Sequence, residues 1–123
     1  MSVVLDTTVL VDVLRRNPDA RNFLKGLAGS PTCSEVTRVE VARGLRSAER
    51  APADRLMAEI RWCPIDEDVA RLAGELGRAF HGSHRHLSTA DLIVAATAQR
   101  LALPLATSNV KLFPMFPRLK PPY

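Results

Sequence analysis

The sequence has few cysteines, few aromatic residues and no long apolar run. Its 123 residues include two cysteines, four phenylalanines, one tryptophan and one tyrosine. The two thiols, Cys33 and Cys63, are too few for a disulfide framework and lack metal-site spacing, so we expect reduced thiols buried in the core. No segment approaches the roughly 20 apolar residues that span a membrane, and Asp6 comes too early for a signal peptide. These absences predict a cytoplasmic protein with no membrane partner.

The remaining composition is typical of a soluble globular protein, with 46% hydrophobic and 24% charged residues. The length predicts one domain, residues 1–123, which can bury a core without a structural metal. The net charge is +4, and 14 of the 17 basic residues are arginine. Because the planar guanidinium suits phosphate groups, an acidic polymer is one explanation of this charge. The alternative is that the charge only confers solubility.

Short apolar runs alternate with longer amphipathic stretches along the chain. The runs predict strands at 2–5, 31–34, 61–65 and 104–107. The amphipathic stretches predict helices over 9–14, 18–26, 37–45, 52–60, 66–80 and from 88 onward. This alternation predicts an α/β fold, a three-layer α/β/α sandwich with a central, mainly parallel sheet. The tail FPMFPRLKPPY is interpreted either as a closing strand followed by an extended segment or as a partly mobile segment.

Three acidic residues follow the predicted strands or begin the helices behind them. Asp6 ends the first strand, Glu40 lies in the first turn of the predicted helix 37–45, and Asp91 lies in the first turn of the last helix. Ligands of open parallel sheets bind at the carboxyl ends of the strands, so these acids can meet at one rim. Carboxylates gathered in one place repel unless a cation lies among them. Oxygen ligands favour Mg²⁺ or Mn²⁺, and the implied chemistry is metal-assisted attack of water on a phosphodiester.

Helix capping is the competing explanation for two of these acids. The pairs Thr37–Glu40 and Ser88–Asp91 both have the spacing of a capping box. Either acid alone is explained by capping, whereas Asp6 could cap the next helix only loosely. The metal hypothesis therefore depends on the set of three acids.

The segments VVLDTTVLVDVLR, SEVTRVEVARG and LSTADLIVAATAQRLALPLATSNVKLF occur in this order over nearly the whole chain. Together they resemble the successive signatures of PIN-domain proteins, most closely the VapC-type toxins of bacterial toxin–antitoxin pairs. The resemblance implies an Mg²⁺- or Mn²⁺-dependent endoribonuclease with an RNA substrate, a cognate antitoxin and a homodimeric state. Asp6, Glu40 and Asp91 match the first three family acids. Thr7 matches the small hydroxyl residue that supports the first acid.

The last family motif is where this sequence departs from the pattern. It often carries an acid after the last strand, whereas this chain has Asn109 in the first possible place and Leu112 in the second. An amide oxygen can coordinate a metal or a water but supplies no charge. We therefore expect either a one-metal site or a second metal that binds only with substrate phosphate.

The resemblance also suggests a role for each site residue. Asp6 and Asp91 would bind the metal directly or through one water, and Glu40 would position or deprotonate the attacking water. Asn109 would orient a water or the scissile phosphate. Its supporting neighbours would be Thr107 and Ser108.

Several other polar residues have both a structural and a functional interpretation. Asp12 and Arg16 have the spacing of a helical ion pair, although the family often keeps an acid at the position of Asp12 too. The histidines of the segment 81–86 lack the partners of a zinc site, so a surface loop is the simpler interpretation. The possible RNA contacts are Arg15, His84 and Arg85.

Two other functions compete with the nuclease. One is a catalytically weak or inactive RNA-binding module on the same fold, because the fourth acid is missing. The other is an Mg²⁺-binding regulatory domain of the phosphoreceiver kind. That class needs adjacent acids in the first loop and an Asp after a central strand, and neither pattern is present.

Overall fold

The computed structural model describes residues 2–84 and 86–123, so the predicted RNA contact Arg85 lies outside the described residues. Four parallel strands form one sheet in the order β3-β2-β1-β4. The strands are β1 (Val4–Leu5), β2 (Thr32–Ser34), β3 (Arg61–Cys63) and β4 (Leu105–Ala106). The helices are α1 (Thr7–Leu14), α2 (Pro18–Lys25), α3 (Glu35–Gly44), α4 (Arg50–Met57), α5 (Glu67–Phe80) and α6 (Thr89–Leu101). Two 3₁₀ turns, η1 (Ser47–Glu49) and η2 (Val110–Leu112), complete the chain.

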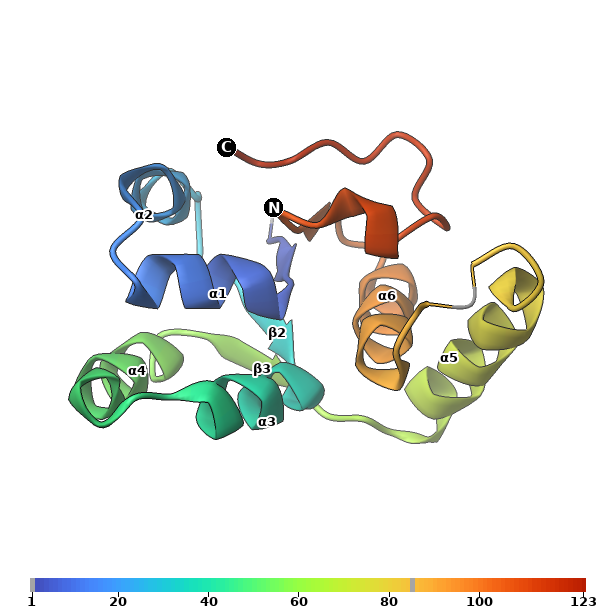
Figure 1. Ribbon diagram of the computed structural model, residues 1–123, viewed down its shortest axis with the longest axis horizontal. Coiled ribbons are helices and arrows are strands. Elements are labelled where there is room, and N and C mark those ends of the chain that lie inside the picture. Colours follow the sequence, from blue (N-terminus) through green and yellow to red (C-terminus); the bar gives the residue numbers. More distant parts are fainter. Residues whose placement is uncertain (1, 85) are drawn as a thin grey trace.

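The first strand divides the core into two layers. Val3 and Leu5 pack with Leu10 of α1 on one face of the sheet, whereas Val4 packs with Val94 of α6 on the other. This alternation follows from the two-residue period of a strand. Figure 1 shows α1 to α4 on one side of the molecule and α5 and α6 on the other. The predicted three-layer α/β/α sandwich is confirmed.

Several helices begin with a side-chain cap, of which the cap at Ser88 is predicted by the sequence. Asp66 accepts a 2.9 Å hydrogen bond from the backbone of Val69 at the start of α5, and Asn17 and Ser88 cap α2 and α6. The start of α3 was predicted incorrectly. Its cap is Ser34, the last residue of β2, whose hydroxyl accepts from Val36 N, so α3 begins at Glu35.

The end of α1 also differs from the prediction. Arg16 has φ 64°, and the amides of Arg16 and Asn17 bond to the carbonyls of Val13 and Asp12, which is a Schellman motif. Arg16 has therefore left the helix, and the predicted Asp12–Arg16 ion pair is wrong. The carboxylate of Asp12 instead accepts a hydrogen bond from the hydroxyl of Tyr123. The ion pairs found among the described residues are Glu35–Arg38, Glu67–Arg71 and Asp68–Arg100.

The C-terminal segment does not form the closing strand that one interpretation of the tail predicts. After η2 it forms no strand within residues 113–123, and it runs back toward α2 (Figure 1). There the ring of Tyr123 lies 6.1 Å from that of Phe23. Of the two thiols, Cys33 is buried as predicted, but Cys63 is only half-buried.

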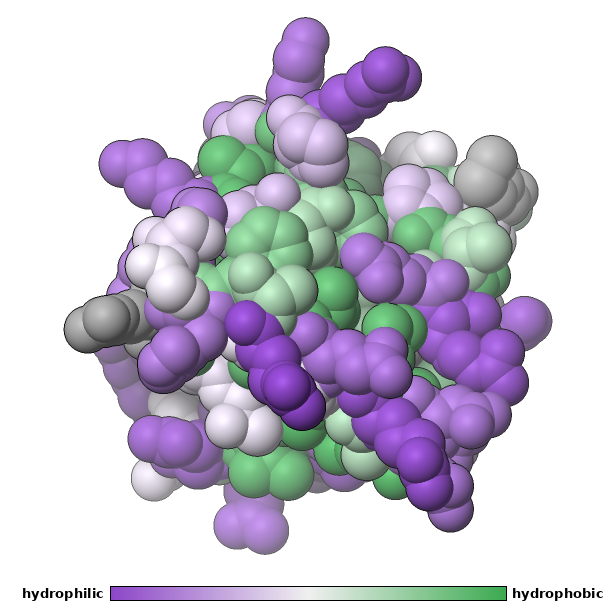
Figure 2. Space-filling view, turned by 90° about the vertical axis from the view of Figure 1, so that its right-hand side faces the viewer, coloured by the Kyte–Doolittle hydropathy of each residue, from purple (hydrophilic) through white to green (hydrophobic). Residues whose placement is uncertain are grey.

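Helices α5 and α6 pack together through a small apolar cluster of Val69, Ala73 and Ala96. Figure 2 shows this side of the molecule, where apolar side chains gather in the middle of the face beside a large polar area. None of the helices in the described part of the chain has the length and apolarity needed to cross a bilayer.

Candidate functional site

Asp6 is the buried centre of the candidate site. It follows β1 directly, caps α1 and is only 4% exposed. Its carboxylate accepts hydrogen bonds from Thr7 N at 2.8 Å, Thr8 Oγ1 at 3.1 Å and Thr107 Oγ1 at 2.8 Å. Burial raises the pKa of Asp6, the three hydrogen bonds oppose that rise, and the charge of Asp91 adds to it. A buried carboxylate with donors but no cationic partner favours the approach of a cation.

Glu40 is held beside this centre by Thr7. The hydroxyl of Thr7 donates a 2.8 Å hydrogen bond to Glu40 Oε1 and also lies 3.2 Å from Thr37 Oγ1. Because α3 starts at Glu35, Glu40 lies in its second turn rather than in the first, so the predicted Thr37–Glu40 capping box is wrong. With that structural role removed, the Glu40 carboxylate is tied to the candidate site alone.

Asp91 forms the capping box that the sequence predicts. Its backbone amide donates to Ser88 Oγ at 3.1 Å, and its Oδ2 accepts from Ser88 N at 3.1 Å. Capping does not separate Asp91 from the site, because its charge acts on the pKa of Asp6. Asp91 therefore has a structural role and a place beside the buried acid.

The three carboxylates do not form a closed ligand set in the part of the chain that the structure describes. Among residues 2–84 and 86–123 there is no group of three acidic, His or Cys side chains with metal-binding geometry. Oε2 of Glu40 and Oδ1 of Asp91 have no hydrogen bond to a described residue. Asp6 accepts three hydrogen bonds, while a carboxylate offers about four acceptor positions. The donor set, oxygen throughout, fits Mg²⁺ or Mn²⁺.

The segment after β4 supports the site from the far end of the chain. The hydroxyl of Thr107 bonds to Asp6, and it also accepts from the amide of Asn109 at 3.0 Å. The amide of Ser108 donates to Thr8 Oγ1 at 3.3 Å. The Asn109 side chain is exposed, whereas Leu112 packs against the core cluster around Val4 and Phe113. The second position where the family motif can carry an acid is thus used for packing.

Thr8 and Thr37 are site residues that the sequence analysis missed. Thr8 donates to Asp6, and buried Thr37 contacts the Thr7 hydroxyl that holds Glu40. The run Asp6-Thr7-Thr8 directly after a strand was the available signal for Thr8. Thr37 carried no usable signal, because its spacing to Glu40 suggested a cap.

Of the other predicted RNA contacts, one lies beside an acid of the candidate site. Arg15 shares a small cavity with Glu40. His84 lies in the loop after α5, where its Nδ1 is 2.8 Å from Ser83 Oγ and its ring is 5.9 Å from that of His86. No zinc-like set of ligands occurs among these histidines within the described residues.

The geometry can be compared with that of known proteins. The family model described as "PIN domain" matches residues 3–115, and the chain belongs to the PIN-domain family. Ribonuclease VapC19 of Mycobacterium tuberculosis is 39% identical over 123 residues, with 98% of each chain covered. Ribonuclease VapC10 of the same species is 40% identical, covering 98% of this chain and 92% of its own. The family resemblance inferred from the sequence is confirmed.

Solved structures show the same fold. One chain of a toxin–antitoxin complex from Klebsiella pneumoniae aligns with a TM-score of 0.83 at 27% identity, covering 99% of this chain and 98% of that one. VapC20 of Mycobacterium tuberculosis, described as a sarcin-ricin loop cleaving toxin, aligns with a TM-score of 0.65 at 18% identity over 83% of this chain and 85% of its own. At 18% identity, this second likeness concerns the fold alone.

Proposed function

We propose that this protein is a metal-dependent endoribonuclease toxin that hydrolyses RNA phosphodiester bonds and is neutralised by a cognate antitoxin. The observation that carries the proposal is the buried carboxylate of Asp6 at the carboxyl edge of the sheet, close to Asp91 and with no cationic partner among the described residues. The names of the relatives VapC19 and VapC10, both ribonucleases, support the reaction class.

Asp6 and Asp91 are proposed to bind the metal, and Glu40 is proposed to lie beside the metal. When bound, Mg²⁺ or Mn²⁺ supplies Lewis-acid activation of water and of the scissile phosphate. The carboxylate of Glu40, fixed through Oε1 by Thr7, accepts the proton of the attacking water at Oε2. Asn109 orients the phosphate with its amide group.

The missing fourth acid limits the charge of this site. Since Asn109 is neutral and Leu112 is apolar and packs against the core, the proposed ligand set has three carboxylates. We therefore propose one resident metal, and a second one only when substrate phosphate contributes its own oxygens.

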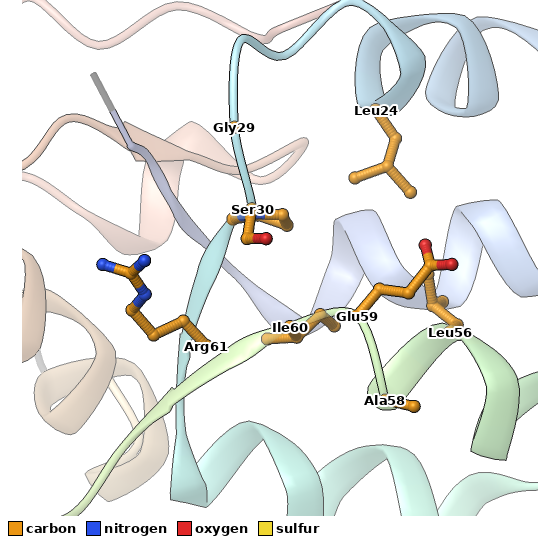
Figure 3. Close-up of a pocket in the computed structure, with 9 residues that line it drawn as sticks. Leu24, Gly29, Ser30, Leu56, Ala58, Glu59, Ile60 and Arg61 are labelled. Carbon is orange, nitrogen blue, oxygen red and sulfur yellow. The ribbon is translucent and has the colours of Figure 1, made fainter.

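The protein partners, a cognate antitoxin and a second copy of this chain, are also proposals. A cavity of about 590 Å³ lies at the amino ends of β2 and β3, away from the acids, between Leu24 of α2, Leu56 of α4 and Ile60. Figure 3 shows Leu24 above this cavity, opposite Leu56 and Ile60. Its apolar walls make it a proposed docking place for the antitoxin. The K. pneumoniae toxin–antitoxin complex supports the existence of such a partner. The homodimer is a further proposal, tested by light scattering of the purified chain.

The nuclease proposal is tested with purified, antitoxin-free protein and structured RNAs in Mg²⁺, Mn²⁺ or EDTA. Cleavage is expected with either metal, is lost in EDTA and falls at least about a thousandfold in Asp6→Asn and Asp91→Asn. The exposed Asp54→Asn of α4 is the matched control and keeps full activity. Full activity of Asp6→Asn would contradict the proposal.

The loss of the fourth acid favours a second candidate function, an RNA-binding module with little or no catalysis. The packing of Leu112 against the core supports it, because that position no longer faces the metal as an acid would. RNA binding without cleavage under every metal condition would establish this module in place of the enzyme.

A further inference from the structure

A second polar surface of the molecule is a groove lined by five arginines, at the opposite end of α1 from Asp6. It has a volume of about 450 Å³ and lies between the end of α1, α2 and the η1–α4 segment. Figure 1 shows these elements together at the left end of the molecule. We call this surface the arginine groove, and its basic residues are Arg15, Arg16, Arg21, Arg46 and Arg55.

The charge of the arginine groove is almost entirely unbalanced. All five arginines lie at the surface, and none belongs to an ion pair among the described residues. The acid in the wall is Glu49, whose Oε1 accepts a 2.9 Å hydrogen bond from Arg46 N. Arg21 uses only its Nε for a bond to the carbonyl of Val13. The remaining guanidinium donors are available to an anion.

Compensation of helix dipoles does not explain this cluster. Arg15 and Arg16 at the end of α1 do complement its negative pole. However, Arg46 precedes η1 and Arg55 comes from α4, so the charges converge from separate elements. Arg16 also occupies the left-handed position of a Schellman motif, which normally favours glycine or asparagine. A locally unfavourable residue at that place is consistent with a functional demand on its side chain.

The arginine groove connects with the candidate catalytic centre. A smaller cavity lined by Glu40 shares Leu14, Arg15 and Glu49 with the groove. Along α1 the helical rise places Arg15 about 13 Å from Asp6, a separation that a few nucleotides of an extended strand can bridge. One strand could thus reach both the acids and the arginines.

We propose that the arginine groove is a phosphate-binding subsite that holds the RNA backbone a few nucleotides from the scissile bond. This inference rests on the proposed ribonuclease function. An RNA strand is favoured over an acidic protein segment because the groove shares part of its wall with the cavity that Glu40 lines. Guanidinium–phosphate bonds would then supply affinity and register, and the acids would supply the chemistry.

The test measures RNA binding separately from cleavage. Full-length protein is titrated in EDTA with a labelled single-stranded oligouridylate at several salt concentrations, using fluorescence anisotropy. The double variant Arg46→Gln/Arg55→Gln is expected to bind about tenfold more weakly, and the salt slope to fall by roughly 0.7 for each phosphate that the variant no longer neutralises. The matched control, Arg71→Gln/Arg78→Gln on α5, removes the same charge from another face and is expected to bind like wild type.

Each outcome decides the inference separately from the nuclease proposal. If the groove variant binds oligouridylate like the control variant while wild type still cleaves RNA, the subsite is refuted and the nuclease stands. If the groove variant loses binding although no RNA is cleaved by wild type, the arginine groove remains a site for RNA phosphate, and its role as a subsite of a nuclease is refuted together with the nuclease. Loss of binding to a polyglutamate peptide, with RNA binding unchanged, would assign the groove to an acidic protein and overturn the inference. Circular dichroism verifies that each variant is folded.

Discussion

The hydroxyl of Thr107 donates a 2.8 Å hydrogen bond to Asp6 Oδ2, joining the ends of the first and last strands across 101 positions of the chain. This bond lowers the pKa of Asp6 against the rise caused by burial. It therefore helps to keep the buried carboxylate ionised and ready for a cation.

Replacing Thr107 by Val keeps the shape and removes that donor. The pKa of Asp6 should rise further, and metal affinity should fall by about 10- to 100-fold, the usual effect of losing a group that orients a ligand. Isothermal titration with Mn²⁺ measures this change. Thr97→Val is the matched control, since Thr97 is also buried but bonds only to Ile93 O within α6. Equal loss in both variants would assign Thr107 a merely structural role.

Thr7 is expected to act through Glu40. Thr7→Val removes the donor to Glu40 Oε1, so kcat for RNA cleavage should fall roughly tenfold or more, while KM changes little. Thr7→Ser retains the hydroxyl and should restore most of the rate. If Thr7→Ser is as slow as Thr7→Val, the methyl packing of Thr7 is what matters instead of its hydrogen bond.

The raised pKa of Asp6 predicts opposite pH effects on stability and on metal binding. The Asp6 carboxyl binds a proton more tightly in the folded state than in the unfolded state. Its contribution to the free energy of unfolding is therefore complete below the ordinary pKa of 3.8 and is lost as pH rises through the raised pKa. Metal binding needs the ionised form and should weaken as pH falls through the same range. At neutral pH, Mg²⁺ should raise the Tm of wild type. Asp6→Asn should show no such rise, and an equal Mg²⁺ shift in both proteins would contradict this assignment.

The backbone at Arg16 predicts a variant that becomes more stable. Since glycine adopts positive φ without steric cost, Arg16→Gly should raise the free energy of unfolding by about 0.5 kcal/mol despite its greater chain entropy. Arg15, with φ −88°, is the matched control, and Arg15→Gly should lower stability. Urea denaturation of both variants checks the sign. A destabilised Arg16→Gly would mean that the Arg16 side chain itself contributes to packing.

The site's central acid could be located from sequence because local rules govern it. A carboxylate directly after an apolar run, as at Asp6, has few structural explanations, and the Ser88–Asp91 box depends on spacing alone. Glu40 was assigned to the wrong helical turn because Ser34, the last residue of a strand, serves as the cap of α3.

Contacts between segments that are far apart in the sequence could not be predicted from such local rules. The bond between Asp12 and Tyr123 spans 111 positions, and the arginine groove gathers side chains from separate elements. Hydrophobic periodicity does not predict such tertiary contacts, because they depend on the path of the loops and the C-terminal tail over the helices. From the sequence, Arg15 was the one groove arginine expected to contact RNA, and Asp12 was paired with the wrong residue.

The pairing of β1 with β4 has a consequence for synthesis of the protein. Asp6 is made 101 residues before its partner Thr107. A chain that is still being synthesised, before Thr107 is added, therefore lacks a complete candidate site. For a protein proposed to destroy RNA, this order of assembly would protect the ribosome and the message during translation until the last strand has folded into place.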